Sequence, residues 1–176
     1  MIDLVLTLIG PDHPGIVDSV SDVVAAHGGN WLESRMAHLA GKFAGVLCVE
    51  VADEQAAALE DALRHLEVNG LKVVVERSAF VEPPRQHAME IELLGADRPG
   101  LVHEISALLA AHNVNVEELV TDRVAAAHSG DRMFHARLRV IIPEIVGATA
   151  VRQGLERLAD DLMVEIRLAE ALGAPR

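Results

Sequence analysis

The sequence is 176 residues long, 51% hydrophobic, and carries a formal net charge of −12 that is spread over both halves. This composition supports one ordinary domain or two small ones and excludes a disordered chain. The acidic excess opposes direct binding to nucleic acid or to an anionic membrane surface, because both need basic patches. No apolar run approaches the roughly 20 residues of a membrane span and no signal peptide opens the sequence, so we expect a cytoplasmic protein.

The first half of the sequence predicts a strand, a turn and a helix in that order. Apolar residues occupy every second position at the start, at Leu4, Leu6 and Leu8, as in a strand with one buried face. A Gly-Pro-Asp-His-Pro-Gly turn follows at 10–15, and the next residues recur at helical spacing, at Ile16, Val20, Val23, Val24 and His27. Gly28 and Gly29 end this helix. The half is completed by strands at about 30–38 and 43–51, a helix through Leu59, Ala62, Leu63 and Leu66, and a strand at 71–76.

The second half repeats the first at an offset of 85 residues. Between Gly10–Asn30 and Gly95–Asn115, ten of 21 positions are identical, which chance rarely gives. The same elements follow in the same order: a strand through Met89, Ile91 and Leu93, a helix with Leu101, Ile105, Leu108, Leu109 and His112, strands at about 114–124 and 133–142, a helix through Val151, Leu155 and Leu158, and a strand at 162–168. Asn113 ends the first of these two helices.

The element order βαββαβ, found twice, predicts the α+β class with two tandem ferredoxin-like domains. Each is expected to be a four-stranded antiparallel sheet with two helices on one face. We place the first domain at 1–78, a linker at 79–87 and the second domain at 88–172. Pro83 and Pro84 exclude a helix from the linker and favour a short extended spacer. Because edge strands of small sheets invite pairing, we also expect a homodimer.

The Asp-x-Pro-Gly turn is the candidate functional site of each copy. Gly15 and Gly100 leave the start of the helix without side chains, and the free N–H groups there suit a carboxylate as well as a phosphate. Asp12 and Asp97 can accept the ammonium group of the same ligand, so one short loop can hold both ends of a free α-amino acid. The alternative is structural: the aspartate is an ordinary helix N-cap, and the glycine only permits close packing.

Two further residue pairs lie near the turn in the sequence. Pro14 and Pro99 suit a helix start, where the missing N–H costs nothing. Asn30 and Asn115 begin the strand that we expect beside the turn. Their amides either reach the ligand or make a strand-entry hydrogen bond.

Histidine and arginine side chains also lie in these segments. The variable position of the turn holds His13 in the first copy and Arg98 in the second, where a cation either assists carboxylate binding or is solvated. His27 and His112 fall on the apolar stripes of their helices and are expected to be satisfied histidines at the core edge. Cys48, the single cysteine, lies in a β-like run and is expected to be a buried small hydrophobic residue.

Motifs for catalysis and metal binding are absent from the sequence. It contains no His-x-x-x-His, Cys-x-x-Cys or Glu-x-x-His pair, no Gly-x-Ser-x-Gly, no phosphate-binding loop and no dinucleotide fingerprint. Aromatic residues are too few to stack on bases. We therefore expect no catalytic residue, no metal, no cofactor and no direct contact with nucleic acid.

The segments GPDHPGIVDSVSDVVAAHGGNW and GADRPGLVHEISALLAAHNVNV resemble the opening strand, turn and helix of ACT domains, ferredoxin-like modules that bind amino acids. Two such domains in tandem resemble the glycine cleavage system transcriptional repressor family. That resemblance implies an amino-acid-responsive regulator, with glycine or serine favoured, that acts through a protein partner such as a DNA-binding transcription factor. The ACT family places its ligand between two paired domains near the first turn, which carries over to Asp12, Pro14, Gly15, Ile16, Asn30, Asp97, Pro99, Gly100, Leu101 and Asn115.

Three functions remain open at this point. The first is an amino-acid sensor whose ligand binds between paired ACT domains and changes the affinity for a protein partner. The second is a ligand-free interaction module, in which the repeats only provide sheet edges for pairing. The third is a detached regulatory subunit of a metabolic enzyme, which would co-purify with a catalytic polypeptide.

Overall fold

The computed structural model describes residues 1–78, 86–125, 132–144 and 148–170. The chain divides into two compact units, Met1–Glu82 and Pro83–Arg176. The first unit contains β1 (Ile2–Pro11), α1 (Ile16–Ala26), β2 (Asn30–Leu39), β3 (Lys42–Val51), α2 (Asp53–His65), the short 3-10 helix η1 (Leu66–Asn69) and β4 (Lys72–Ser78). The second contains β5 (Gln86–Ala96), α3 (Leu101–Ala111), β6 (Asn115–Ala125), β7 (Arg132–Pro143), α4 (Ala148–Leu162) and β8 (Glu165–Glu170).

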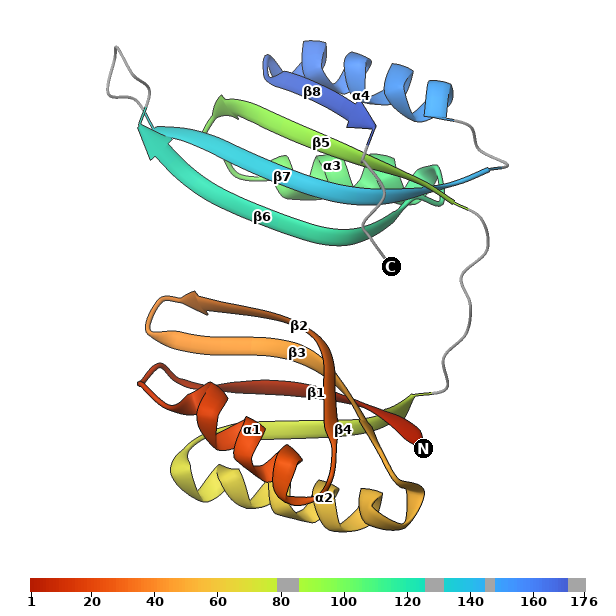
Figure 1. The fold of residues 1–176 in the computed structure, drawn as a ribbon. Coiled ribbons are helices and arrows are strands. Elements are labelled where there is room, and N and C mark those ends of the chain that lie inside the picture. The colour runs from red at the N-terminus through yellow and green to blue at the C-terminus, as the bar shows by residue number, and fades with distance from the viewer. Residues whose placement is uncertain (79–85, 126–131, 145–147, 171–176) are drawn as a thin grey trace. The chain divides into compact units, whose positions relative to one another are not determined.

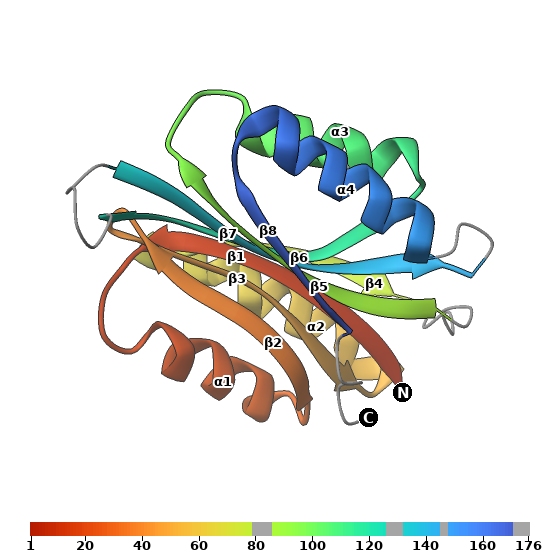
Figure 2. The same cartoon turned by 90° about the horizontal axis from the view of Figure 1, so that it is seen from above.

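Each unit is a four-stranded antiparallel sheet covered on one face by its two helices (Figures 1 and 2). The strand orders are β2-β3-β1-β4 and β6-β7-β5-β8, so the first strand of each repeat lies at the centre of its sheet. The same irregularity recurs in both edge strands, between Trp31 and Glu33 and between Val116 and Glu118. The predicted α+β class with two tandem ferredoxin-like domains is confirmed.

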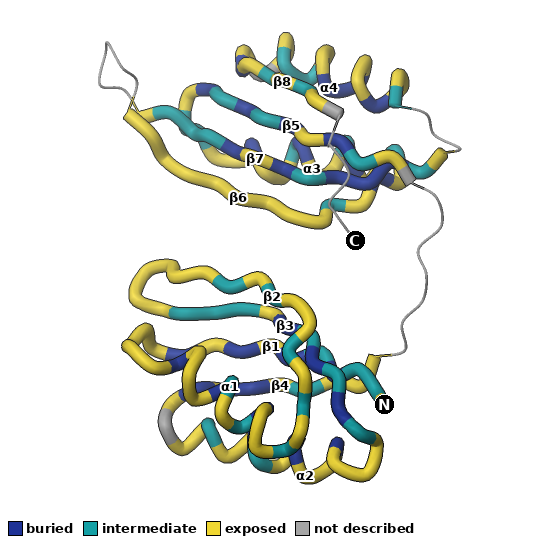
Figure 3. The backbone as a smooth tube through the Cα atoms, in the orientation of Figure 1, coloured by how far each residue is buried: buried dark blue, intermediate teal, exposed yellow. Residues whose placement is uncertain are grey.

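The core of each unit lies between the helices and the sheet. In the first unit the alternating leucines Leu4, Leu6 and Leu8 are at most 1% exposed, and they pack with apolar residues of α1 and α2. Figure 3 shows buried stretches along β1 of this sheet. Met89, Ile91 and Leu93 hold the same place in the second unit. The two clusters share no residue. Burial of one such side chain stabilises the fold by about 1.5–3 kcal/mol.

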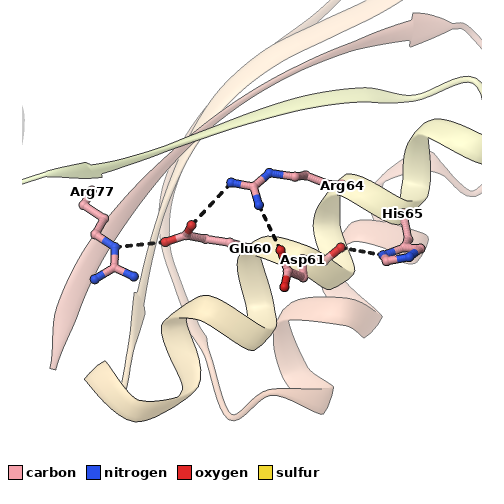
Figure 4. A network of polar contacts seen from close by, with 5 residues as sticks. All are labelled: Glu60, Asp61, Arg64, His65 and Arg77. Atoms are coloured by element: carbon pink, nitrogen blue, oxygen red, sulfur yellow. Dashed lines mark hydrogen bonds and ion pairs between the residues drawn. The ribbon is translucent and has the colours of Figure 1, made fainter.

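A cluster of ion pairs joins α2 to β4 in the first unit (Figure 4). Glu60 accepts a hydrogen bond from Arg77 Nε at 3.0 Å, and Arg64 NH1 donates to Asp61 at 2.9 Å. The arginines are more than half exposed, so each pair contributes on the order of 0.2–1 kcal/mol. This cluster supports the fold and leaves the turn untouched.

The boundary between the units differs slightly from the predicted one. Most of the linker placed at 79–87 lies outside the described residues, but Gln86 and His87 belong to β5, where they oppose Pro143 and Ile142. The strand starts two residues earlier than predicted because its antiparallel partner β7 extends as far as Pro143. Among the described helices, none is both long and apolar enough to cross a bilayer.

Candidate ligand-binding turns

The glycine of each turn is required by backbone conformation. Gly15 is the N-cap of α1 with φ 93°, and Gly100 is the N-cap of α3 with φ 97°. A side chain on a residue in this left-handed region is strained, so glycine is favoured. A Cβ built on Gly15 would meet nothing within 4 Å, and one on Gly100 would approach Glu104 at 3.5 Å. The backbone at the first turn is therefore open to a ligand.

The backbone N–H groups at the starts of α1 and α3 are available as hydrogen-bond donors. The first helical bonds run from Ser19 N–H to Gly15 and from Glu104 N–H to Gly100, each 2.9 Å long. Within the described residues, the backbone bonds outside regular elements do not use the N–H groups of Gly15, Ile16 and Val17 or of Gly100, Leu101 and Val102. Together with the positive end of the helix dipole, these donors form the predicted place for a carboxylate.

Asp12 is not the N-cap of α1. Gly15 occupies that position, and no side chain makes a cap hydrogen bond there. The Asp12 N–H bonds Gly41 O at 3.1 Å, and its carboxylate is 43% exposed and lies 3.7 Å from His38 Nε2. The structural alternative, in which this aspartate caps the helix, is wrong in this respect. The carboxylate remains accessible beside the helix start.

Asp97 has a stronger partner than its counterpart in the first unit. Its N–H bonds Arg132 O at 3.1 Å, the same backbone contact that Asp12 makes with Gly41. Its carboxylate is 21% exposed and lies 3.1 Å from Arg123 Nε. Arg123 stands 85 residues after His38, at the equivalent strand position. The same scaffold therefore presents one aspartate to a histidine and the other to an arginine.

The side chains at the variable position of the two turns have different surroundings. Arg98 donates two hydrogen bonds to Glu104, at 3.2 and 2.9 Å, so its guanidinium holds a carboxylate of the helix that follows the turn. Glu104 is partly buried by this pair. His13 is exposed, and its Nδ1 lies 3.0 Å from Pro14 O. The Arg98 guanidinium is therefore already paired, whereas His13 is exposed to solvent.

Asn30 and Asn115 do not lie beside the turn of their own unit, and that prediction is wrong. Asn30 opposes Glu50 on β3, whereas Pro11, at the turn, opposes Lys42. Eight residues of a strand separate these two points, which is about 26 Å. The reason is that α1 runs the length of the sheet before β2 begins. Asn115 is displaced in the same way, since it opposes Ile141 at the far end of β7.

The remaining polar residues of the helices have structural partners. His27 Nδ1 lies 2.8 Å from Val23 O, and His112 Nδ1 lies 3.0 Å from Leu108 O, both half-buried. These contacts agree with satisfied histidines at the core edge. Cys48 differs from expectation: it is only partly buried, on the sheet face opposite the helices. No group of three or more metal-ligating side chains occurs within the residues that the structure describes.

A hollow of about 490 Å³ lies at the second turn. It is lined in part by Asp97, Gly100, Arg123 and Phe134. A larger depression of about 630 Å³ lies on the outer face of the second sheet, among Glu90, Arg137 and their neighbours, and does not include the turn. The hollow lies at the start of α3, but the Asp97 carboxylate in its lining already pairs with Arg123.

His38 and Arg123 are the polar residues that sequence reasoning missed. Both lie on edge strands, and they oppose Phe43 and Phe134, which pack against the cores. Their side chains therefore point to the helical face, where the turns lie. The 85-residue offset that relates the turns also relates this pair, so the repeat itself carried the signal.

Two protein-family models match the chain, and both describe an ACT domain. One covers residues 3–76 and the other residues 89–160. The chain belongs to the ACT family. The two matched ranges fall in the two compact units, so this is a tandem ACT protein.

Some known proteins resemble the chain over nearly its whole length. The ACT chain is 27% identical over 161 residues to the glycine cleavage system transcriptional repressor of Escherichia coli strain K12, covering 90% of this chain and 85% of that protein. A crystal structure of an unknown protein from Galdieria sulphuraria matches with a TM-score of 0.83 at 29% identity, over 97% of this chain and 99% of the other. A crystal structure provisionally named as a glycine cleavage system transcriptional repressor shares the fold, with a TM-score of 0.72 at 20% identity over 97% of each chain. This is an ACT-domain regulatory protein related to that repressor.

Proposed function

We propose that this ACT protein senses a small amino acid and passes the signal to a protein partner, such as a DNA-binding transcription factor, without binding DNA itself. The related repressor of Escherichia coli supports a role in transcription. The formal net charge of −12 supports a protein partner, because a phosphate backbone repels an acidic surface. We place the protein in the cytoplasm and assign it no catalytic activity.

The first turn carries the proposal. The N–H groups of Ile16 and Val17 bind the ligand carboxylate, and the Asp12 carboxylate accepts its ammonium group. The supporting observation is that Asp12 makes no cap hydrogen bond and, among the residues that the structure describes, pairs with a histidine and not with an arginine. It precedes helical N–H groups that the described backbone bonds outside regular elements leave unused. A small ligand fits best at an open backbone, and the family resemblance favours glycine or serine.

The ACT resemblance implies a site between two paired domains. Asn30 cannot reach the turn of its own unit, but it can serve a ligand bound at the turn of another ACT domain. This arrangement would make ligand binding depend on domain pairing. Such dependence is what a sensor needs, because a ligand shifts an equilibrium only by binding its two states with different affinity.

A thermal-shift panel of the twenty amino acids, confirmed by calorimetry, tests the sensing role. A ligand at about 100 times its dissociation constant adds roughly 2.7 kcal/mol of stability, which is a rise of several degrees in Tm for a chain of this size. We expect a selective shift with glycine or serine. A flat panel would reject the sensor and favour the ligand-free interaction module.

Matched variants assign the site. Asp12→Asn removes the charge that binds the ammonium group, so we expect at least about a tenfold loss of affinity with less than about 0.5 kcal/mol change in stability. Asp97→Asn is the control, because Arg123 already holds that carboxylate. Equal losses in both variants would place ligands at both turns. Co-purification of a catalytic polypeptide with the wild-type protein would instead favour the enzyme-subunit role.

A further inference from the structure

The outer face of the first sheet, on the side away from the helices, is apolar at its centre. Val5, Thr7, Val46, Cys48 and Val74 oppose one another across β1, β3 and β4. We call these residues, with the neighbouring Ile9 and Ala44, the apolar face. Ile9, Val46 and Val74 are each 46–48% exposed. Contiguous exposed apolar surface of this kind marks an interaction site.

The equivalent face of the second sheet is charged. Glu90, Glu92, Arg137, Arg139 and Arg167 stand at the places of Val5, Thr7, Val46, Cys48 and Val74. Several of its charges are satisfied locally: Glu92 lies 2.8 Å from His135 Nε2, and Arg139 Nε lies 3.1 Å from Glu117. The charged side chains of this face interact favourably with water. The apolar face has the same backbone but lacks such side chains, so its exposure to water is less favourable.

Charges at the two ends of the apolar face have opposite signs. Asp3, Glu33, Glu50 and Glu76 lie toward one end, and Lys42 and Lys72 lie toward the other. The acidic end reaches the centre, because Glu33 opposes Cys48 on the neighbouring strand. Burial first, and then Asp3 and Glu33, raise the pKa of the Cys48 thiol. A partner for this face must therefore be apolar in the middle, basic at one end and acidic at the other.

A second copy of the same face meets that requirement in one orientation. We propose that the apolar face binds the apolar face of a second copy of this chain. The two copies are related by a two-fold axis that lies between the two sheets, parallel to their planes and perpendicular to the strands. This axis places the acidic end of one copy over the basic end of the other. A two-fold axis parallel to the strands would instead place acid over acid, Asp3 over Glu50 and Glu33 over Glu76.

The register of the sheet specifies the contacts. β4 of one copy lies over β4 of the other and runs in the opposite direction, so Lys72 faces Glu76 of the second copy. Val46, Thr7 and Val74 share the central row, so each lies near its own counterpart at the axis. Arg35 is also in this row, but it lies on the edge strand, where its side chain is exposed to solvent. Two packed sheets are about 10 Å apart, within reach of a short crosslinker.

Crosslinking across the axis tests the geometry. In a Cys48→Ser background, Val46→Cys should be linked to its counterpart in high yield by a short thiol-reactive bifunctional reagent. Ala57→Cys, exposed on α2 on the opposite side of the unit, is the control and should give little crosslinking. Equal yields at the two positions would overturn the proposal.

Charge reversal provides a second readout in the intact chain. By sedimentation, Lys72→Glu or Glu76→Lys alone should weaken the dimer, while the double variant should restore it because each swapped charge again faces an opposite one. Val46→Asp should give a folded monomer, since Val46 is half exposed. A wild-type chain that stays monomeric, or a dimer that is insensitive to Val46→Asp, would overturn the proposal. A monomer whose Val46→Cys thiol is protected from reagents would likewise do so, because the face would then be covered from within the chain.

Discussion

The two units of this protein share a backbone and differ in what surrounds their shared turn. In the first unit Asp12 faces His38 at 3.7 Å, and in the second Asp97 faces Arg123 at 3.1 Å. Arg98 adds a paired contact with Glu104 that His13 does not make at its own turn. The two repeats therefore share a scaffold and differ in the charged side chains around the aspartate. The aspartate of the first turn is 43% exposed beside a histidine, and that of the second turn is 21% exposed and paired with an arginine.

The same contrast extends to the outer faces of the two sheets. Val46 in the first unit has the place that Arg137 has in the second, and neighbouring positions follow the same rule. Alternation along a strand requires apolar residues only on the helical side, so the outer face is free to vary. One face has become apolar and the other charged, with no change in strand order.

The largest effect should come from opening a cavity in one core. Leu6→Ala removes a side chain that is 0% exposed, and Ile91→Ala removes its counterpart 85 residues later, at 1% exposure. We expect each to cost about 2–5 kcal/mol, confined to its own unit, because the two core clusters share no residue. Hydrogen exchange resolved by peptide measures this. Loss of protection in both units from a single substitution would show that the units unfold as one.

Valine at a turn glycine should have the next largest effect. Gly15→Val and Gly100→Val both place a β-branched residue at φ above 90°, which costs about 1–3 kcal/mol. Gly15→Val should also abolish the amino-acid response, because the new side chain stands over the helical N–H groups. Calorimetric titration of the folded variant measures the response. Normal binding by Gly15→Val would make the turn purely structural.

Exchanging the residues that face the two aspartates should change ligand affinity at the two turns in opposite directions. In His38→Arg, a permanent cation competes with the ligand ammonium for Asp12, so we expect affinity at the first turn to fall about three- to tenfold. In Arg123→His, Asp97 is released, and the second turn should gain affinity. Titration of both variants with the amino acid selected by the panel measures the change. An unchanged affinity in His38→Arg would exclude Asp12 as the ammonium acceptor.

The smallest effect concerns the charged outer face of the second sheet. The hydrogen bond from His135, and then nearby cations, lower the pKa of Glu92 below its usual range. A lowered folded-state pKa contributes stability that is present above the usual range for glutamate and is lost as the pH falls through the folded value. Glu92→Gln should therefore be slightly less stable than wild type at pH 7, and the difference should vanish in acid. Melting curves between pH 7 and pH 3 test this, and a difference that grows in acid would contradict it.

Much of the fold was predictable because it depends on local periodicity. Alternation at Leu4, Leu6 and Leu8 and the helical stripe from Ile16 both survive in the structure as buried faces. The position of the turn followed from the repeat. The surroundings of the turn did not, because His38 reaches Asp12 only through strand pairing, and the Glu104 partner of Arg98 lies in the first turn of α3.

The sequence alone determined the repeat, the order of elements and the open helix start, because each depends on residues close together in the chain. Only the tertiary structure decided which end of the sheet Asn30 occupies and which cation faces each aspartate. It also decided that Val5, Val46 and Val74 form one continuous apolar face. The physical reason is register: antiparallel pairing places residues that are distant in the chain opposite one another, and hydrophobic periodicity within one strand does not specify its partner.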